Sequence, residues 1–266
     1  MEFERSLAGI LVLLATSMAA DAEQIELTPV ADATLFEDNP EFASGAGDFL
    51  FVGPIASGSP RRALLRFDLS SIPVGAVIDS ATLRFTVDRA AIGSDPGDQV
   101  RLYRLLAPWG EGSSNAGSGG AGTTAAIGDA TWSHRFFGMP ANGQAHTFWT
   151  TSGGDFGNTP SVVINFGGPG NYTLPSTSQI VADVQQWVNA PAQTFGWILL
   201  GPEGGEFSQK ARRLYSRTSP AVDGRPRLTV SYTTTPPGAV TKSVPLPGWA
   251  IGLCAVTLIF FGTRQT

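Results

Sequence analysis

The stretch Ala76-Val77-Ile78-Asp79-Ser80-Ala81-Thr82-Leu83-Arg84-Phe85-Thr86-Val87 decides the fold class of this chain. In its second half, apolar Ala, Leu, Phe and Val alternate with polar Thr and Arg. Successive side chains of a β-strand point to opposite faces, so this period of two places the apolar side chains on one face and the polar ones on the other. The stretch therefore predicts a long, half-buried strand of an antiparallel sheet.

Shorter apolar runs of strand length recur on both sides of this stretch. Gly, Pro, Asn and Asp separate them, as expected for turns between short strands. The runs that predict strands most clearly are residues 24–30, 49–52, 63–67, 76–87, 100–106, 161–166, 195–200 and 227–232. Together they predict an all-β domain built as an antiparallel β-sandwich of the jelly-roll type.

One stretch has a different period. Between Ile180 and Val188, apolar residues recur at intervals of three and four, which is typical of one face of an amphipathic helix. Ser178 is suited to be the N-cap of this helix, and Asn189-Ala190-Pro191 is suited to end it. We expect one short helix that closes one end of the sandwich, with Trp187 packed in the core.

The composition of the 266 residues excludes several classes of protein. The 17 Lys and Arg and 22 Asp and Glu give a net charge of -5, and no basic run is interleaved with aromatic residues, so nucleic acid is not an expected partner. Cys254 is the single cysteine, which excludes an internal disulfide and a cysteine-ligated zinc cluster. Residues 107–131 are rich in small residues and predict a flexible loop, because the G-x-G-x-x-G spacing within them lacks a βαβ context.

Both ends of the chain carry apolar segments that are typical of targeting signals. Residues 1–22 contain the apolar run 7–15 and end in Ala20-Asp21-Ala22, a pattern that predicts a secretory signal peptide cleaved before Glu23. An uncleaved membrane anchor is the alternative. At the other end, a Thr/Pro-rich linker, residues 233–243, precedes residues 244–266. Their apolar run is shorter than the about 20 residues that span a bilayer comfortably, so it predicts a short transmembrane helix.

The C-terminal segment resembles a known sorting signal. It consists of Val244, Pro245, Leu246 and Pro247, then the apolar run, then Arg264. This order is similar to the PEP-CTERM-type signal in its Val-Pro-Leu-Pro variant. The resemblance implies an exosortase-type processing protease as a partner, transient insertion in the membrane, and delivery to the cell surface or extracellular matrix of a Gram-negative-type bacterium. A plain C-terminal anchor is the alternative.

The body of the chain, residues 23–232, resembles the DNRLRE domain family. The resemblance rests on residues 62–73, the turn Trp109-Gly110-Glu111-Gly112, Ala130-Thr131-Trp132, and the closing Arg225-Pro226-Arg227-Leu228-Thr229-Val230. It implies a non-catalytic β-sandwich similar to carbohydrate-binding modules, some of which bind acidic polysaccharides. Because the sequence shows no enzyme domain beside the module, we expect binding itself to be the function.

The aromatic candidates for sugar binding lie in loop-rich sequence. Trp109, Trp132 and Trp149 are placed there, where an indole face can stack on a pyranose ring. Packing of the same side chains inside the protein is the alternative. Trp197 lies in an apolar run and is expected in the core.

The basic candidates for sugar binding are two pairs of arginines. They are Arg61 with Arg62 and Arg212 with Arg213. A guanidinium group pairs with a carboxylate through two parallel hydrogen bonds, so these side chains are suited to an acidic glycan. We expect replacement of Arg212 and Arg213 to weaken such binding and to leave folding intact.

A structural calcium ion is a further expectation. Calcium takes about six to eight oxygen ligands, which carboxylates and backbone carbonyls in loops can supply. Asp32 and Asp183 resemble positions near the ends of such sandwich modules that hold an ion, and Asp38 lies in another acidic turn. Solvated turn carboxylates are the alternative.

No set of catalytic residues stands out in the sequence. The histidines are His134 and His146. Carboxylates for a glycosidase would have to come from scattered positions, namely Asp38, Glu41, Asp48, Glu111, Asp155 and Glu206. The sequence therefore predicts an exported, surface-sorted, non-catalytic module that binds extracellular polysaccharide, acidic by preference, or is embedded in it. A structural matrix protein or an adhesin that binds another protein is the alternative.

Overall fold

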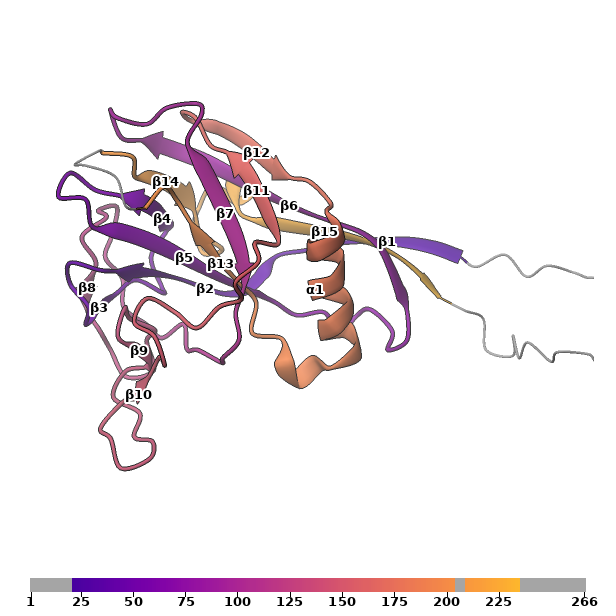
Figure 1. Ribbon diagram of the computed structural model, residues 1–266, viewed down its shortest axis with the longest axis horizontal. Coiled ribbons are helices and arrows are strands. Elements are labelled where there is room, and N and C mark those ends of the chain that lie inside the picture. The colour runs from indigo at the N-terminus through magenta and orange to yellow at the C-terminus, as the bar shows by residue number, and fades with distance from the viewer. Residues whose placement is uncertain (1–20, 204–208, 235–266) are drawn as a thin grey trace, which may run out of the picture. The chain divides into compact units, whose positions relative to one another are not determined.

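The long strand predicted from the alternating pattern is β6, Val77–Ala90 (Figure 1). The structure is a computed structural model that describes residues 21–203 and 209–234. From Ala81 to Val87, the side chains of β6 are alternately buried and partly exposed. This confirms the half-buried strand. Among the described residues, three other strands pair with β6.

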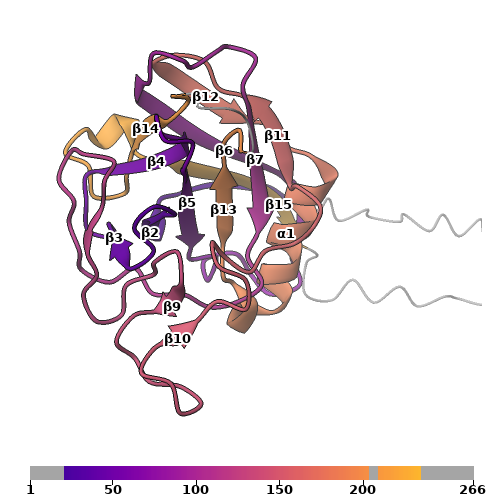
Figure 2. The ribbon, with the colours of Figure 1, turned by 60° about the vertical axis from the view of Figure 1, so that its left-hand side comes forward.

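The strands form a large antiparallel sheet that curls into two halves, and both halves supply side chains to one core (Figures 1 and 2). The first half-sheet contains β6 together with β1 (Asp21–Leu27), β4 (Phe49–Pro54), β12 (Gly170–Leu174), β14 (Arg212–Tyr215) and β15 (Arg227–Thr234). The second half-sheet contains β2 (Pro29–Phe36), β5 (Pro60–Phe67), β7 (Gln99–Arg104), β11 (Val162–Asn165) and β13 (Trp197–Leu200). This arrangement confirms the predicted all-β, sandwich-like fold.

The two half-sheets are joined through β4. Its first residues pair with β14, and its last two, Gly53 and Pro54, pair with β5. Gly53 has a φ of 94°, and a Cβ atom there would lie 2.7 Å from the carbonyl oxygen of Lys210. Glycine is therefore required where the strand turns from one half-sheet into the other.

Near the start of the body, the sequence predicts one strand where the structure has two. The predicted strand 24–30 is divided between β1 and β2, which pair with β15 and β5 respectively and belong to different half-sheets. The missed part of β2 contains Asp32 and Thr34, two buried polar residues that weaken its hydrophobic pattern.

The predicted amphipathic helix is present as α1, Ser178–Asn189. Its N-cap is Thr177 and not Ser178, because the Thr177 hydroxyl accepts a hydrogen bond from the N–H of Ile180 at 3.1 Å. The helix buries Trp187, whose ring lies 4.5 Å from that of Trp197 in an edge-on contact. Both tryptophans are in the main core, as predicted. Two 3-10 turns follow α1 in the chain, η1 (Pro191–Gln193) and η2 (Val222–Gly224).

A long insertion covers the outer face of the second half-sheet. We call residues 105–157 the cover segment, since a bridge between Leu105 and Phe156 closes it. It contains β8 (Thr123–Thr124), which pairs with β3 (Phe42–Ala43), and the pair β9 (His134–Phe136) and β10 (Thr147–Phe148). Because the cover segment buries the second face of β13, all four residues of that strand are buried, and its sequence is apolar without alternation.

Several predictions concern residues outside those that the structure describes. They are the greater part of the signal peptide, the linker from residue 235 on, and the sorting signal with Val244, Pro245, Leu246, Pro247 and Arg264. Within the described ranges, no helix has the length and apolar character needed to cross a membrane.

Candidate functional site

The three tryptophans predicted to bind sugar are buried under the cover segment. Trp109, Trp132 and Trp149 are 1%, 8% and 5% exposed and belong to a second apolar cluster, between the cover segment and the second half-sheet. The indole N–H of Trp109 donates to the carbonyl of Phe195 at 2.8 Å, and that of Trp149 donates to the carbonyl of Thr131 at 2.9 Å. These side chains pack the cover onto the sheet, so the expectation that they present a free face to a sugar is corrected.

The glycine-rich part of the cover segment is held by one buried carboxylate. Asp129 is fully buried and accepts hydrogen bonds from the backbone N–H groups of Ser113 at 2.8 Å and Ala126 at 2.7 Å. At Gly112, which has a φ of 68°, a Cβ atom would overlap the Asp129 carboxylate. The stretch expected to be a flexible loop therefore has hydrogen bonds that tie its residues 113–114 to residues 126–129.

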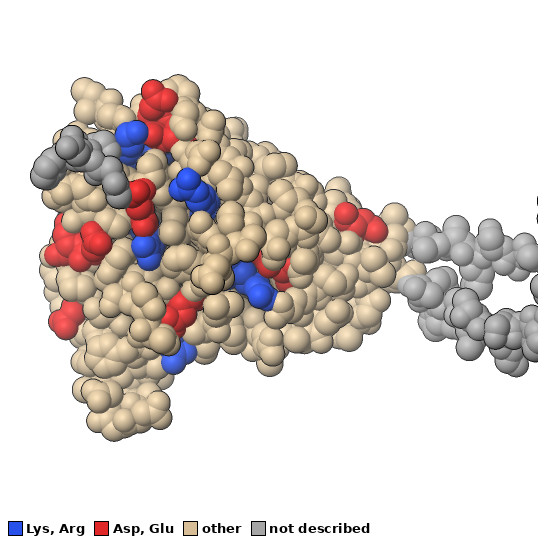
Figure 3. All heavy atoms as spheres, in the orientation of Figure 1, with Lys and Arg blue, Asp and Glu red and all other residues tan. Residues whose placement is uncertain are grey.

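The four predicted sugar-binding arginines each form an ion pair within the protein. The pairs are Arg61 with Asp38, Arg62 with Glu203, Arg212 with Asp98, and Arg213 with Asp88. Figure 3 shows the same tendency on one face of the molecule, where basic and acidic side chains are interspersed and no continuous basic area forms. The arginines are therefore not a free basic patch.

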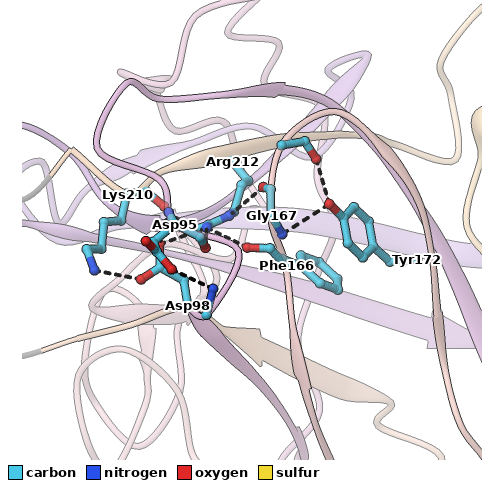
Figure 4. A network of polar contacts seen from close by, with 9 residues as sticks. Asp95, Asp98, Phe166, Gly167, Tyr172, Lys210 and Arg212 are labelled. Carbon is cyan, nitrogen blue, oxygen red and sulfur yellow. Dashed lines mark hydrogen bonds and ion pairs between the residues drawn. The ribbon is translucent and has the colours of Figure 1, made fainter.

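Arg212 is the most enclosed of the four arginines. Its side chain is fully buried, and its guanidinium donates to the carbonyl of Phe166 at 2.5 Å and to Asp98 at 2.8 Å (Figure 4). Burial opposes ionisation of Asp98, but hydrogen bonds from the Asp95 N–H, Lys210 and Arg212 hold the pKa of Asp98 below its usual value. Arg212 thus joins three chain segments, and all three guanidinium nitrogens already donate hydrogen bonds. These contacts lead us to expect that loss of Arg212 impairs folding, in contrast to the expectation from the sequence.

Three of these arginines line one small pocket. Arg61, Arg212 and Arg213 surround it together with Phe51 and Ala211, and its volume is 300 Å³. Their guanidinium groups are turned toward carboxylates and carbonyl groups, so the wall of the pocket is formed mainly by aliphatic stems and other apolar atoms. These three guanidinium groups are therefore not free to bind an acidic sugar, whereas Arg89, an exposed arginine, also lines the pocket.

The three aspartates predicted to bind calcium do not form one site. Asp38 pairs with Arg61, while Asp183 accepts from the Trp197 indole N–H at 2.9 Å. Asp32 accepts from the backbone N–H of Arg217 at 2.6 Å, and burial raises the pKa of Asp32 to about 7. Over the described ranges, no group of three or more His, Cys, Asp or Glu side chains could hold a metal ion. Calcium stays a prediction, and backbone oxygens would have to supply most of its ligands.

An open groove of 590 Å³ lies where the two ends of the cover segment meet. We call it the polar groove. Its lining combines hydroxyl and amide side chains with one cation, one carboxylate and apolar surface. The lining residues are Arg62, Leu106, Ala107, Thr150, Thr151, Ser152, Gly154, Asp155, Phe156 and Asn158.

The wall of the polar groove is fixed by contacts behind it. The Asp155 carboxylate accepts from the backbone N–H groups of Thr150 at 3.0 Å and Thr151 at 2.9 Å, which sets the loop that carries the hydroxyl groups. Phe156 packs against Tyr103 with ring centres 5.2 Å apart. These contacts hold the backbone of the loop that carries the polar side chains before any ligand arrives.

Two of the predicted residues meet at the polar groove. The guanidinium carbon of Arg62 lies 4.5 Å from the centre of the Trp132 ring, so Arg62 covers the indole that the sequence proposed as a sugar platform. Trp149 directly precedes the loop that lines the groove. Thr151, Ser152 and Asn158 were not predicted as site residues, although the run Thr150-Thr151-Ser152-Gly153-Gly154-Asp155 has the composition of a polar turn.

A second cavity, at the end of α1, has a different character. Its volume is 530 Å³, and it is lined mainly by apolar side chains, including Leu69, Ile72 and Val188. Arg66 and Asp68 are the charged groups in its lining. The polar groove offers more hydrogen-bonding side chains and is the better candidate for a hydrophilic ligand.

The two histidine rings contact each other at a tilt of 44° in the cover segment. The ring centres of His134 and His146 are 4.6 Å apart, and His134 is 2% exposed. Burial and, secondly, the neighbouring His146 lower the pKa of His134, while Glu41 acts in the opposite direction. His146 Nδ1 accepts a hydrogen bond from the Gly138 N–H at 2.7 Å, which requires that nitrogen to be unprotonated.

The contact between His134 and His146 predicts that the folded protein loses stability in acid. Because the folded-state pKa of His134 lies below its usual value, the unfolded chain binds a proton first, and stability falls as the pH drops from about 6.5 through the folded-state pKa. Thermal unfolding at pH 7.5 and pH 5 should show a larger drop in the wild type than in His146→Gln. Glutamine can still accept the Gly138 hydrogen bond and places no charge beside His134. Equal drops in the two proteins would contradict this prediction.

The fold and the groove define a class of protein, an antiparallel β-sandwich with a pre-formed polar groove on a covered sheet. No protein-family model matches the chain, and no curated protein matches it either. The resemblance to the DNRLRE family and to the sorting signal therefore stays a prediction from the sequence.

Proposed function

We propose that this chain is an exported, surface-sorted, non-catalytic module that binds extracellular polysaccharide or is embedded in it. The observation that carries the proposal is the polar groove, in which hydroxyl and amide groups lie beside the apolar side chains of Leu106 and Phe156. Sugars present hydroxyl groups at their edges and C–H groups on their faces, so a pocket of this mixed character matches them. Export and sorting rest on the patterns at the two ends of the sequence.

The groove supports binding better than turnover. Hydrolysis of a glycosidic bond usually needs two carboxyl groups that face each other across the substrate. Asp155 is the single carboxylate among the described residues that line the groove, and both of its oxygens accept backbone hydrogen bonds. A polymer would make only shallow contact with one such open groove. High affinity would come from many copies of the protein that bind the same polymer at once.

Filling the groove should abolish polysaccharide binding. Ser152 is exposed in the groove, so Ser152→Trp places a large side chain where the ligand would lie. We expect at least about a tenfold loss of retention on the best polysaccharide of a panel of neutral and acidic polymers, measured with calcium and with chelator. Ser57→Trp, at an exposed serine on a turn outside the groove, is the matched control and should bind as the wild type does.

The thermal midpoints of both tryptophan variants should equal that of the wild type. Undiminished retention by Ser152→Trp would remove the groove as the binding site. Failure of the folded wild type to bind any polymer in the panel would reject the proposal as a whole.

A partner protein is the second candidate, and exposed apolar side chains favour it. Ile127, Met139 and Phe148 of the cover segment are 76%, 45% and 44% exposed. Ile127 lies against Gly138, and Met139 lies near Gly128. Ile127 and Met139 therefore form one apolar area where these two stretches of the cover segment meet. If this area mediates attachment, Ser152→Trp will leave attachment to cells or matrix unchanged.

A further inference from the structure

Arg62 is the one cation among the described residues that line the polar groove, and its hydrogen-bonding edge is already occupied. Its Nε donates to one carboxylate oxygen of Glu203 at 2.9 Å, and its Nη2 donates to the other at 2.7 Å. This is the bidentate arrangement in which arginine binds a carboxylate. An acidic sugar would therefore have to displace Glu203 before it could use the same edge.

The remaining contacts of Arg62 prevent it from turning toward a ligand. Its Nη1 donates to the carbonyl of Gly153 at 2.7 Å. The guanidinium lies 4.5 Å from the centre of the Trp132 ring and 5.5 Å from that of Phe156. The side chain is 13% exposed, so the group is held between two aromatic rings and two acceptors.

The charges at the groove add up to an excess of negative charge. Arg62 supplies one positive charge, whereas Glu203 and Asp155 each supply a negative one. Asp155 is partly exposed, and its oxygens accept backbone N–H groups, with no cation as a partner among the described residues. A carboxylate that entered the groove would meet like charges, whereas a hydroxyl group could donate to them.

We infer that the polar groove selects neutral, hydroxyl-rich polysaccharides and discriminates against uronic acid polymers, and that the Arg62–Glu203 ion pair is the specificity determinant. This inference rests on the proposed function and reverses the preference for acidic glycans that the sequence suggested. In this arrangement Glu203 neutralises the cation that would otherwise attract a carboxylate, and Thr151, Ser152 and Asn158 are left to bind sugar hydroxyl groups.

Matched pairs of polymers test the selectivity directly. β-1,4-Mannan with β-1,4-polymannuronate, and β-1,4-glucan with β-1,4-polyglucuronate, share a linkage and differ chiefly in whether C6 is a hydroxymethyl group or a carboxylate. The full chain should bind the neutral member of at least one pair about tenfold more tightly than the acidic member. Because the contacts are uncharged, that affinity should change little between low salt and about 0.5 M salt.

Glu203→Gln should shift the selectivity of the groove from the neutral polymer toward the acidic one. The substitution keeps the length of the side chain but removes the negative charge and one of the two acceptor oxygens, so a uronate carboxylate can displace the side chain from the edge of Arg62. Affinity for the acidic polymer should rise about tenfold and should become sensitive to salt. Glu26→Gln is the matched control: Glu26 also forms an ion pair with an arginine, Arg227 at 3.8 Å, but lies on β1, outside the groove lining.

The outcomes separate the inference from the function on which it rests. Equal or tighter binding of the acidic polymer by the wild type would overturn the neutral selectivity while leaving polysaccharide binding in place. A Glu203→Gln variant with the same selectivity as Glu26→Gln would overturn the role of the ion pair. Absence of binding to any polymer by folded wild type and variants would reject both the inference and the proposed function.

Discussion

Replacement of Arg212 by methionine is expected to destabilise the protein by about 3–5 kcal/mol. Arg212 is fully buried, and its loss leaves Asp98, which is 5% exposed, without one of its two cationic partners. The carbonyl groups of Phe166 and Gly167 lose their donors at the same time. Buried acceptors without donors cost more than the hydrogen bonds themselves contribute, and methionine restores only the apolar volume.

The measurement is unfolding by chemical denaturant, with the thermal midpoint as a second readout. For a body of this size, the expected loss corresponds to a fall of the midpoint by roughly 10 °C. Arg101→Met is the control, because Arg101 lies on β7 and donates to the exposed side chain of Gln99. Its loss should cost less than about 1 kcal/mol. An Arg212→Met protein as stable as Arg101→Met would show that the buried network contributes little.

This result bears on any search for ligands with arginine variants. A protein that lacks both Arg212 and Arg213 would lose binding through loss of structure, whatever its ligand is. Variants at the polar groove, such as Glu203→Gln, change an exposed ion pair and leave the buried network of Arg212 intact. Binding experiments therefore need the groove variants.

Replacement of Trp109 by alanine is expected to cost about 3–5 kcal/mol of stability and to loosen the cover segment. Trp109 is 1% exposed, and its indole N–H donates to the carbonyl of Phe195. The guanidinium of Arg66 lies 5.5 Å from the centre of its ring. Alanine would leave a cavity between the cover segment and β5, and the carbonyl of Phe195 would lose its donor.

Denaturant unfolding measures the loss, and limited proteolysis within residues 105–157 reports whether the cover segment opens. Phe148→Ala serves as the control, since Phe148 is an aromatic residue of the same segment that is 44% exposed. It should unfold within about 1 kcal/mol of the wild type and resist the protease equally. A Trp109→Ala protein that folds normally but no longer binds polysaccharide would restore Trp109 as a ligand contact.

Some parts of the fold could be predicted because the signal is local in the sequence. In β6, the alternation from Ala81 to Val87 gives both the strand and its buried face, since the period of two is a property of the strand itself. In α1, the spacing of Ile180, Val184 and Trp187 gives the helix and its buried face. The end of β1 could not be predicted, because the apolar pattern continues across Thr28 while the chain passes to the other half-sheet.

The candidate site was predicted only in part for the same reason. Arg62 and Trp132 were identified by residue type, but no pattern in the sequence indicates that one side chain covers the other. Hydroxyl residues such as Thr151 and Ser152 are too common in loops to be singled out without their positions. Their importance follows from the groove that they line.

The sequence alone determined the class of fold, the helix and the core positions of Trp187 and Trp197, because hydrophobic periodicity is set by neighbouring residues. The tertiary structure decided which polar residues are free to act. Arg212 is separated from Asp98 by 114 residues, and Arg62 is separated from Glu203 by 141. Ion pairing depends on distance in space, which the chain fixes only when distant segments pack together. A buried, paired arginine and an available one are therefore alike in sequence and different in function.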